Sequence, residues 1–310
     1  MNTVIRYPAK DELNENYEKK CICFRKTFDA DVNTKKASIK VYGGARYLLY
    51  VNTLPVLRFI SFSDKDNRKY KEADISQFIR NGKNAICVMM MPDKDDAAFL
   101  YIEASVEKDN NEVLTIKSDA SFKCDILKAY DNNAPKTDIT KPCCEIFDNR
   151  VYDESWLEGD FDDSKWINAE QIADKYTLRL EKESISSKEE EINAKLIIAA
   201  GAGNETDDDI LLHKKLEKEV IKTDIGHVFV VGASCEIKPL DKGTFSYVLV
   251  DFEKAVTGFL RLDITAYNGD IVDVCFAKEL KEERPVIDSV ARFILKDDKN
   301  IVETRLQLAR

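Results

Sequence analysis

The sequence predicts an all-β protein, in the main, made of two antiparallel β-sandwich domains joined by a short helical connector. Three observations support this prediction. Apolar and polar residues alternate in several short runs, as they do on strands with one buried face. Glycine-containing pairs that favour tight turns separate some of these runs. One charged stretch carries apolar residues at helical spacing.

A charged arm at residues 1–20 is expected to precede the first domain, which we place at residues 21–180. Its first strand is predicted at Cys21–Phe28, where an apolar run continues through two basic residues. Alternating residues before Gly43-Gly44 and after it, at Arg46–Val51, predict a hairpin across the two glycines.

A short helical turn is expected in the middle of this domain. Asp74 can cap it, and Ile75, Phe78 and Ile79 share one face. Asn81-Gly82 then ends the turn ahead of a buried strand.

The connector is placed at residues 181–224, where the sequence becomes rich in charge. Its longest apolar run is Leu196–Ala200, which a turn-prone glycine-rich stretch follows. A helix is predicted at Asp207–Ile221, because acids lie at its start, lysines lie later and leucines recur at helical spacing.

The second sandwich domain is placed at residues 225–310. Leu260–Tyr267 alternate strictly, and Asn268-Gly269 is expected to close a two-residue hairpin into a return strand at Val272–Phe276. Alternation at Val302–Leu308 indicates that the sequence stops inside or just after a strand. We therefore expect a fragment of a longer protein, truncated in its second sandwich.

Composition fits a soluble globular protein. The chain has 310 residues, 44% hydrophobic and 34% charged, with 57 acidic and 47 basic residues. The formal net charge of -10 includes no basic stripe for a phosphate backbone, so nucleic acid is not an expected partner. No apolar run is long enough for a signal core or a membrane span, which predicts no membrane partner and a cytoplasmic location.

The cysteines are expected to be reduced core residues; they are Cys21, Cys23, Cys87, Cys124, Cys143, Cys144, Cys235 and Cys275.

Four short motifs give the second domain a resemblance to the all-β domain that precedes the catalytic barrel in bacterial α-L-rhamnosidases. They are Asp251-Phe252, Gly258-Phe259, Asn268-Gly269 and Glu279-Leu280. The turn at Asp74-Ile75 and the segment Phe147–Ala169 likewise resemble the jelly-roll, galactose-binding-like sandwich at the front of many glycoside hydrolases.

The resemblance implies an accessory, non-catalytic portion of an inverting hydrolase of terminal α-L-rhamnosides. Its partners would be the C-terminal catalytic barrel of the parent protein and a rhamnose-containing glycan. The two catalytic carboxylates would belong to that barrel, so no catalytic residue is assigned here and the chain alone is expected to be inactive. The alternatives are a stand-alone carbohydrate-binding module and a protein-interaction scaffold.

Aromatic residues are the candidates for carbohydrate binding, because apolar sugar faces stack on rings. Trp156 is favoured, since acidic residues surround it, and Tyr42 and Tyr50 are the further candidates. Trp166 is expected to be a core residue, because it enters a strand after a turn.

No cofactor or metal site is predicted. Asp160, Asp162 and Asp163 lack the regular spacing of a calcium loop and suit a solvated turn better. His213 and His227 have no partners at zinc-ligand spacing. The glycine-rich stretch at residues 201–203 lacks the glycine and lysine of a phosphate loop.

Overall fold

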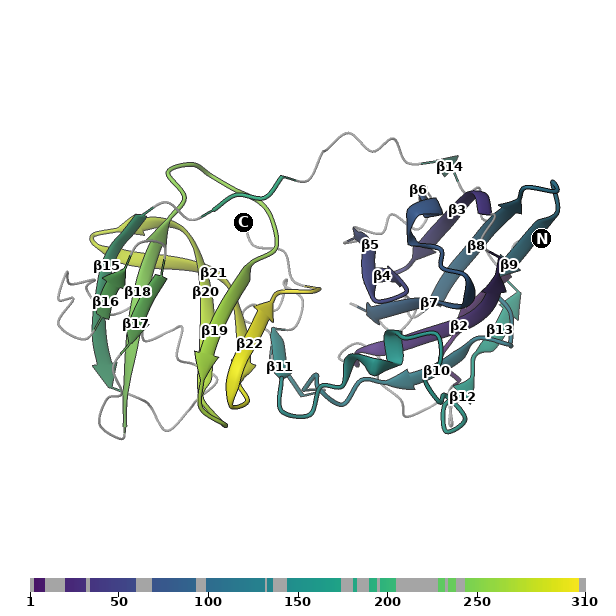
Figure 1. Cartoon of the computed structure of the whole chain (residues 1–310). Helices are drawn as coiled ribbons and strands as arrows, with labels where there is room; N and C mark the ends of the chain where they lie inside the picture. Colours follow the sequence, from purple (N-terminus) through teal and green to yellow (C-terminus); the bar gives the residue numbers. More distant parts are fainter. Residues whose placement is uncertain are drawn as a thin grey trace.

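The structure is a computed structural model that describes residues 3–8, 20–31, 34–59, 69–92, 99–131, 133–135, 144–173, 181–182, 190–193, 196–204, 228–231, 234–237 and 243–306. Two lobes of strands make up this part of the chain (Figure 1). Its helical elements are single 3-10 turns, η1 (Ser76–Phe78) and η3 (Glu154–Leu157). The mainly β prediction is therefore confirmed, while the helix expected at Asp207–Ile221 lies outside the described residues. Within the described ranges no helix is long and apolar enough to cross a bilayer.

Two sheets packed face to face form the N-terminal lobe. One has seven strands in the order β13-β1-β8-β3-β6-β14, with β9 paired to β8. Its strands are β1 (Thr3–Arg6), β3 (Thr34–Gly43), β6 (Lys69–Asp74), β8 (Phe99–Lys108), β9 (Val113–Lys117), β13 (Glu170–Ala173) and β14 (Glu181–Lys182). The other has six strands in the order β12-β10-β2-β7-β4-β5. These are β2 (Ile22–Ala30), β4 (Arg46–Val51), β5 (Leu54–Phe59), β7 (Gly82–Met91), β10 (Lys123–Ile126) and β12 (Ile167–Asn168).

Smaller sheets form the C-terminal lobe. A three-stranded sheet has the order β11-β21-β20, and three two-stranded sheets pair β15 with β18, β16 with β17 and β19 with β22. The strands are β11 (Glu145–Asp148), β15 (Leu196–Asn204), β16 (Val228–Val231), β17 (Ser234–Ile237), β18 (Thr244–Asp251), β19 (Arg261–Ala266), β20 (Ile271–Lys281), β21 (Arg284–Ile294) and β22 (Asp298–Glu303). Most pairs are antiparallel, whereas β11 with β21 and β14 with β6 are parallel.

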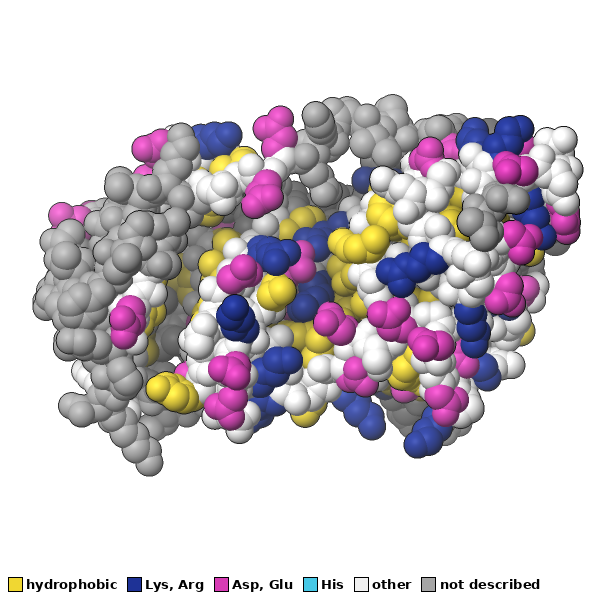
Figure 2. Space-filling view, in the orientation of Figure 1, with side chains coloured by type: hydrophobic (Ala, Val, Ile, Leu, Met, Phe, Trp, Pro, Cys, Tyr) yellow, Lys and Arg dark blue, Asp and Glu magenta, His cyan; other side chains and the backbone are white. Residues whose placement is uncertain are grey.

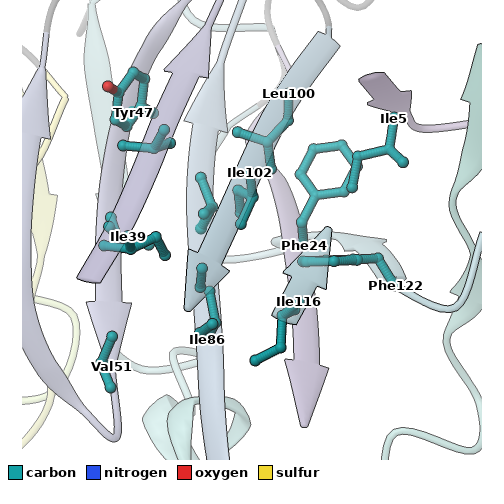
Figure 3. Close-up of a cluster of buried hydrophobic side chains, with 14 of the residues drawn as sticks. Ile5, Phe24, Ile39, Tyr47, Val51, Ile86, Leu100, Ile102, Ile116 and Phe122 are labelled. Carbon is teal, nitrogen blue, oxygen red and sulfur yellow. The ribbon is translucent and has the colours of Figure 1, made fainter. Parts of the chain in front are cut away.

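The first hydrophobic core lies between the two large sheets, and Figure 3 shows part of it. The seven-stranded sheet contributes alternate residues, such as Ile39 of β3 and Ile102 of β8. In contrast, β4 is buried at every residue and β7 at every residue from Asn84 to Met91. A second core covers the other face of the six-stranded sheet, which explains these continuous apolar runs.

Both predicted hairpins are wrong, because each turn joins strands of different sheets. Gly43-Gly44 lies between β3 and β4, and Asn268-Gly269 lies between β19 and β20. A type I′ hairpin needs positive φ at both central residues. Of the second pair, Gly269 alone has one, 94°, and Asp270 N donates to Tyr267 O at 3.1 Å. This is the geometry of a type II turn, which lets β19 pair with β22 instead of β20.

Hairpin turns do occur at two pairs that lack glycine. Asn52 and Thr53 have φ of 49° and 71° between β4 and β5, and Glu282 and Glu283 have φ of 50° and 61° between β20 and β21. The turn at Asp74 is confirmed, since its carboxylate accepts hydrogen bonds from Ser76 N and Oγ.

Two further segments differ from expectation. Thr3–Arg6, expected in an arm, form β1 and pair with β8 and β13, so the strands do not begin at Cys21. Leu196–Asn204 form one strand, so residues 201–204 are not a turn. Gly201 and Gly203 face Tyr247 and Phe245 across the ladder, where a Cβ would lie 2.5 Å from Tyr247 Oη and 2.5 Å from Phe245 Cζ. Glycine at these two positions leaves room for the aromatic side chains to lie over the neighbouring strand.

Candidate functional site at the junction of the two lobes

Strand β11 connects the two lobes. It lies in sequence between β10 and β12 of the N-terminal lobe, yet it pairs with β21 of the C-terminal lobe. Glu145 and Phe147 are buried on one face of it, as the two-residue period of a strand requires. The chain then returns through η3 to β12, which pairs with β10 of the N-terminal lobe. Residues of one lobe are thus built into the sheet of the other.

Glu145 is fully buried at this junction. Its Oε1 accepts hydrogen bonds from Tyr130 Oη at 2.6 Å and Arg305 N at 2.9 Å, and its Oε2 accepts one from Leu306 N at 3.3 Å. These donors replace the water that a buried carboxylate loses. Burial, and then the charge of Glu145, raises the pKa of Tyr130. The hydroxyl therefore stays protonated and available as a donor.

Arg305 is a buried cation that lies among the aromatic rings of the junction. Its guanidinium carbon lies 4.4 Å from the centre of the Phe147 ring and 5.2 Å from that of Tyr152, within the range of cation–π attraction. Burial alone would lower the pKa of Arg305, but Tyr130, Tyr152 and the Glu145 carboxylate more than offset it and raise the pKa. Arg305 therefore remains charged inside the protein.

Two further arginines reach the same segment from the six-stranded sheet. Arg46, of which 1% is exposed, donates from Nη1 to Leu306 O at 3.2 Å. Arg58 donates from Nη1 to Thr304 O at 3.4 Å, pairs with Glu303 and lies 4.2 Å from the centre of the Phe259 ring. In Figure 2, dark blue basic and yellow hydrophobic side chains gather where the lobes meet.

The three aromatic residues predicted to bind sugar are buried. Trp156 is 3% exposed, Tyr50 is 7% exposed and Tyr42 is 3% exposed. Trp156 packs against Tyr50 with ring centroids 6.3 Å apart, inside the second core, whereas Tyr42 lies in a separate cluster on the seven-stranded sheet. Trp166, expected in the core, is half-buried and packs against the same cluster as the buried Trp156.

The acidic turn predicted at Asp160–Asp163 is organised by a buried arginine. Arg25 Nη2 donates to Glu158 O at 2.5 Å and Gly159 O at 3.2 Å, and its Nε lies 3.6 Å from Asp163 Oδ2. Asp162 accepts from Ser164 N, as in an Asx turn. Within the part of the chain that the structure describes, no three metal-ligating side chains gather. His213 and His227 lie outside the described residues.

The cysteine side chains of the described residues differ in how deeply they are buried. Cys21, Cys23, Cys87, Cys124 and Cys144 are buried, Cys275 is half-buried and Cys235 is exposed. The expectation of a core position is therefore wrong for Cys235, and Cys143 lies outside the described residues. Burial raises the pKa of the Cys23 and Cys87 thiols, and raises that of Cys124 to about 12. Protonated thiols of this kind are poor nucleophiles.

The buried charges of the junction are not among the residues that the sequence motifs single out. Glu145 stands two residues before Phe147, and Arg46 opens an apolar run, so both occupy inward positions of a strand. A charged residue at an inward position is the signal that could have revealed them, because such a residue has to find buried partners.

The geometry defines a class of protein: a mainly β molecule with a charged junction buried between two lobes. Solved structures give this class a closer description. The chain is similar to a GH78 family rhamnosidase of Bacillus sp. GL1, with a TM-score of 0.75 and 14% identity over 100% of this chain and 52% of that one. It is also similar to the α-L-rhamnosidase of Dictyoglumus thermophilum, with a TM-score of 0.62 and 20% identity over 99% of this chain and 32% of that one. The α-L-rhamnosidase of Aspergillus terreus gives a TM-score of 0.64 at 14% identity, over 99% and 33%.

The chain thus has the fold of the β-rich N-terminal region of α-L-rhamnosidases, and it spans about a third to a half of their length. This agrees with the resemblance that the sequence motifs carry. No protein-family model and no curated sequence matches the chain.

Proposed function

We propose that this chain is the accessory β region of a rhamnosidase-like glycoside hydrolase and that it supports a catalytic helical barrel. One observation carries the proposal: the whole chain aligns with 52% of a GH78 family rhamnosidase at a TM-score of 0.75. The part of that relative which this chain does not cover leaves room for a further domain, such as a catalytic barrel. The proposal includes hydrolysis of α-L-rhamnosides with inversion, a rhamnose-containing substrate and a cytoplasmic location.

The junction suits a supporting role. Apolar packing and buried hydrogen bonds from both lobes make them one body, and a rigid body can hold an attached domain in a fixed place. The groups of the junction are engaged with one another: Glu145 accepts from backbone N–H groups, and Arg305 lies over aromatic rings. This arrangement favours structural support over chemistry.

An assay tests the proposal directly. The purified chain should not hydrolyse an aryl α-L-rhamnoside, whereas the protein encoded by the complete reading frame should. Turnover by the 310-residue chain that survives repurification and is lost on substitution of one of its acids would contradict the accessory role. A reading frame that ends at Arg310 would contradict the attached barrel.

Carbohydrate binding is the second candidate, and half-buried Trp166 is the observation that favours it. Calorimetric titration with L-rhamnose and with rhamnose-containing oligosaccharides would detect such binding. The heat of binding should be lost in Trp166→Ala and retained in Tyr267→Ala, which removes an exposed ring from the other lobe. Without binding, the interaction scaffold is preferred over the carbohydrate-binding module.

A further inference from the structure

The backbone that follows β22 is held by charged side chains from distant parts of the sequence. Glu145 accepts from the N–H groups of Arg305 and Leu306, which lie 160 and 161 residues further along the chain. Arg46 donates to Leu306 O over 260 residues, and Arg58 donates to Thr304 O over 246 residues. In this segment, the backbone N–H groups of Arg305 and Leu306 donate to a carboxylate. The backbone carbonyls of Thr304 and Leu306 accept from arginines.

The C-terminal lobe holds the first residue of this segment. Thr304 N donates to Leu260 O at 3.0 Å, and Leu260 N donates to Thr304 Oγ1 at 2.9 Å. Thr304 is fully buried, and Leu306 is 1% exposed. The segment is therefore fixed against both lobes at once.

We propose that Glu145, Arg46 and Arg58 form a charged clamp that fixes the backbone of residues 304–306 and so sets the direction in which the chain leaves residue 306. Apolar packing is non-directional, so it could not by itself fix this direction. Hydrogen bonds to charged groups are directional and stronger than neutral ones. The clamp goes beyond the proposed function, because it acts on this segment whatever follows it.

Hydrogen exchange measured amide by amide tests the clamp. Glu145→Gln removes the charge and keeps the shape of the side chain. Exchange at Arg305 and Leu306 should become at least about tenfold faster, because each loses a bond to a charged acceptor. Exchange in β7, at the centre of the six-stranded sheet, should stay unchanged. Glu170→Gln is the matched control, because Glu170 is a half-exposed partner of Arg6 and should leave residues 304–306 unaffected.

A second variant covers the case in which Glu145→Gln does not fold. Arg58 is partly exposed, so Arg58→Met should fold, and it should also speed exchange at Arg305 while leaving β7 unchanged. Unchanged exchange at residues 305 and 306 in the folded variants would overturn the clamp. Equal acceleration in β7 would overturn it too, since that result means general loosening of the protein.

Discussion

Charged side chains in this interior mark places where the fold is held together. Arg25 fixes the loop that contains Gly159 and Asp163, and Glu145 fixes the segment at Arg305. The loop packs so closely here that position 159 needs glycine, because a Cβ there would lie 2.6 Å from Lys83 O. Removing one partner of such a group leaves an uncompensated buried charge, which costs far more than losing a surface pair. At the residue scale, burial therefore decides what a side chain contributes.

The two tryptophans should respond differently to truncation. Trp156→Ala removes a ring buried against Tyr50 and should lower the free energy of unfolding by about 3–5 kcal/mol through lost packing and a cavity. Trp166→Ala removes a half-buried ring and should cost clearly less. Urea unfolding of both variants measures this. Equal losses would show that Trp166 is as much a core residue as Trp156.

The turn at Asn52-Thr53 stores backbone strain. Thr53 is β-branched and has a φ of 71°, where such a residue is an outlier. Thr53→Gly should therefore raise the free energy of unfolding by about 0.5–1 kcal/mol. Thr265→Gly is the matched control, because Thr265 lies exposed in the extended strand β19 and glycine should destabilise it. Chemical unfolding of both variants distinguishes turn strain from a general effect of glycine.

At the scale of elements, the same residue pattern gives different turns according to which strands meet. Asn268-Gly269 could close a hairpin, yet β19 pairs with β22 and β20 pairs with β21, so the pair forms a turn between sheets. Asn-Gly allows several turn types, because glycine accepts positive φ in each of them. The choice depends on β21 and β22, which come later in the chain and which the local sequence around the turn does not specify.

A cross-strand ion pair between β3 and β8 should make stability depend on pH. Lys40 faces Glu103 in the ladder, with Nζ 3.0 Å from Oε1. The hydrogen bond from Lys40 lowers the pKa of Glu103 below its usual 4.5, and the bond to Glu103 raises that of Lys40 above 10.5. The carboxyl contribution is present above the unfolded pKa and is lost as pH falls through the folded pKa. The lysine contribution is present below 10.5 and is lost as pH rises through the folded pKa.

Glu103→Gln should therefore destabilise the protein by about 0.5 kcal/mol at pH 7, since both side chains are about a third exposed. The difference from the unchanged protein should shrink toward zero at about pH 2.5, where carboxyl groups are protonated. Urea unfolding at the two pH values measures it. Glu236→Gln, at an exposed position, should cause no measurable change at either pH. A Glu103 effect that is equal at both pH values would exclude the ion pair as its cause.

At the scale of the whole molecule, the two lobes share a core. The second hydrophobic cluster joins residues of β4 and β7 to Phe293 of β21 and Val302 of β22. The parallel pairing of β11 with β21 adds backbone hydrogen bonds to this contact. An interface of this kind couples the stabilities of the parts that it joins.

The described lobes should therefore unfold together. Differential scanning calorimetry should give one transition with equal calorimetric and van't Hoff enthalpies. Phe293→Ala should shift the whole transition to lower temperature, because Phe293 is fully buried in the shared core and its truncation costs about 3–5 kcal/mol. A Phe293→Ala transition that splits, with the N-terminal lobe melting at its original temperature, would show that the lobes are independent.

Local sequence patterns are enough to predict a mainly β fold, the inward faces of strands such as β3 and β19, and the turn at Asp74. These features depend on interactions between residues close in the chain, which periodicity and turn chemistry record. Long-range packing sets which strands pair, covers the six-stranded sheet on both faces, and buries Trp156 more deeply than Trp166. It also placed Glu145 against Arg305. Burial depends on surfaces that come together from distant parts of the sequence, so no local pattern contains both partners.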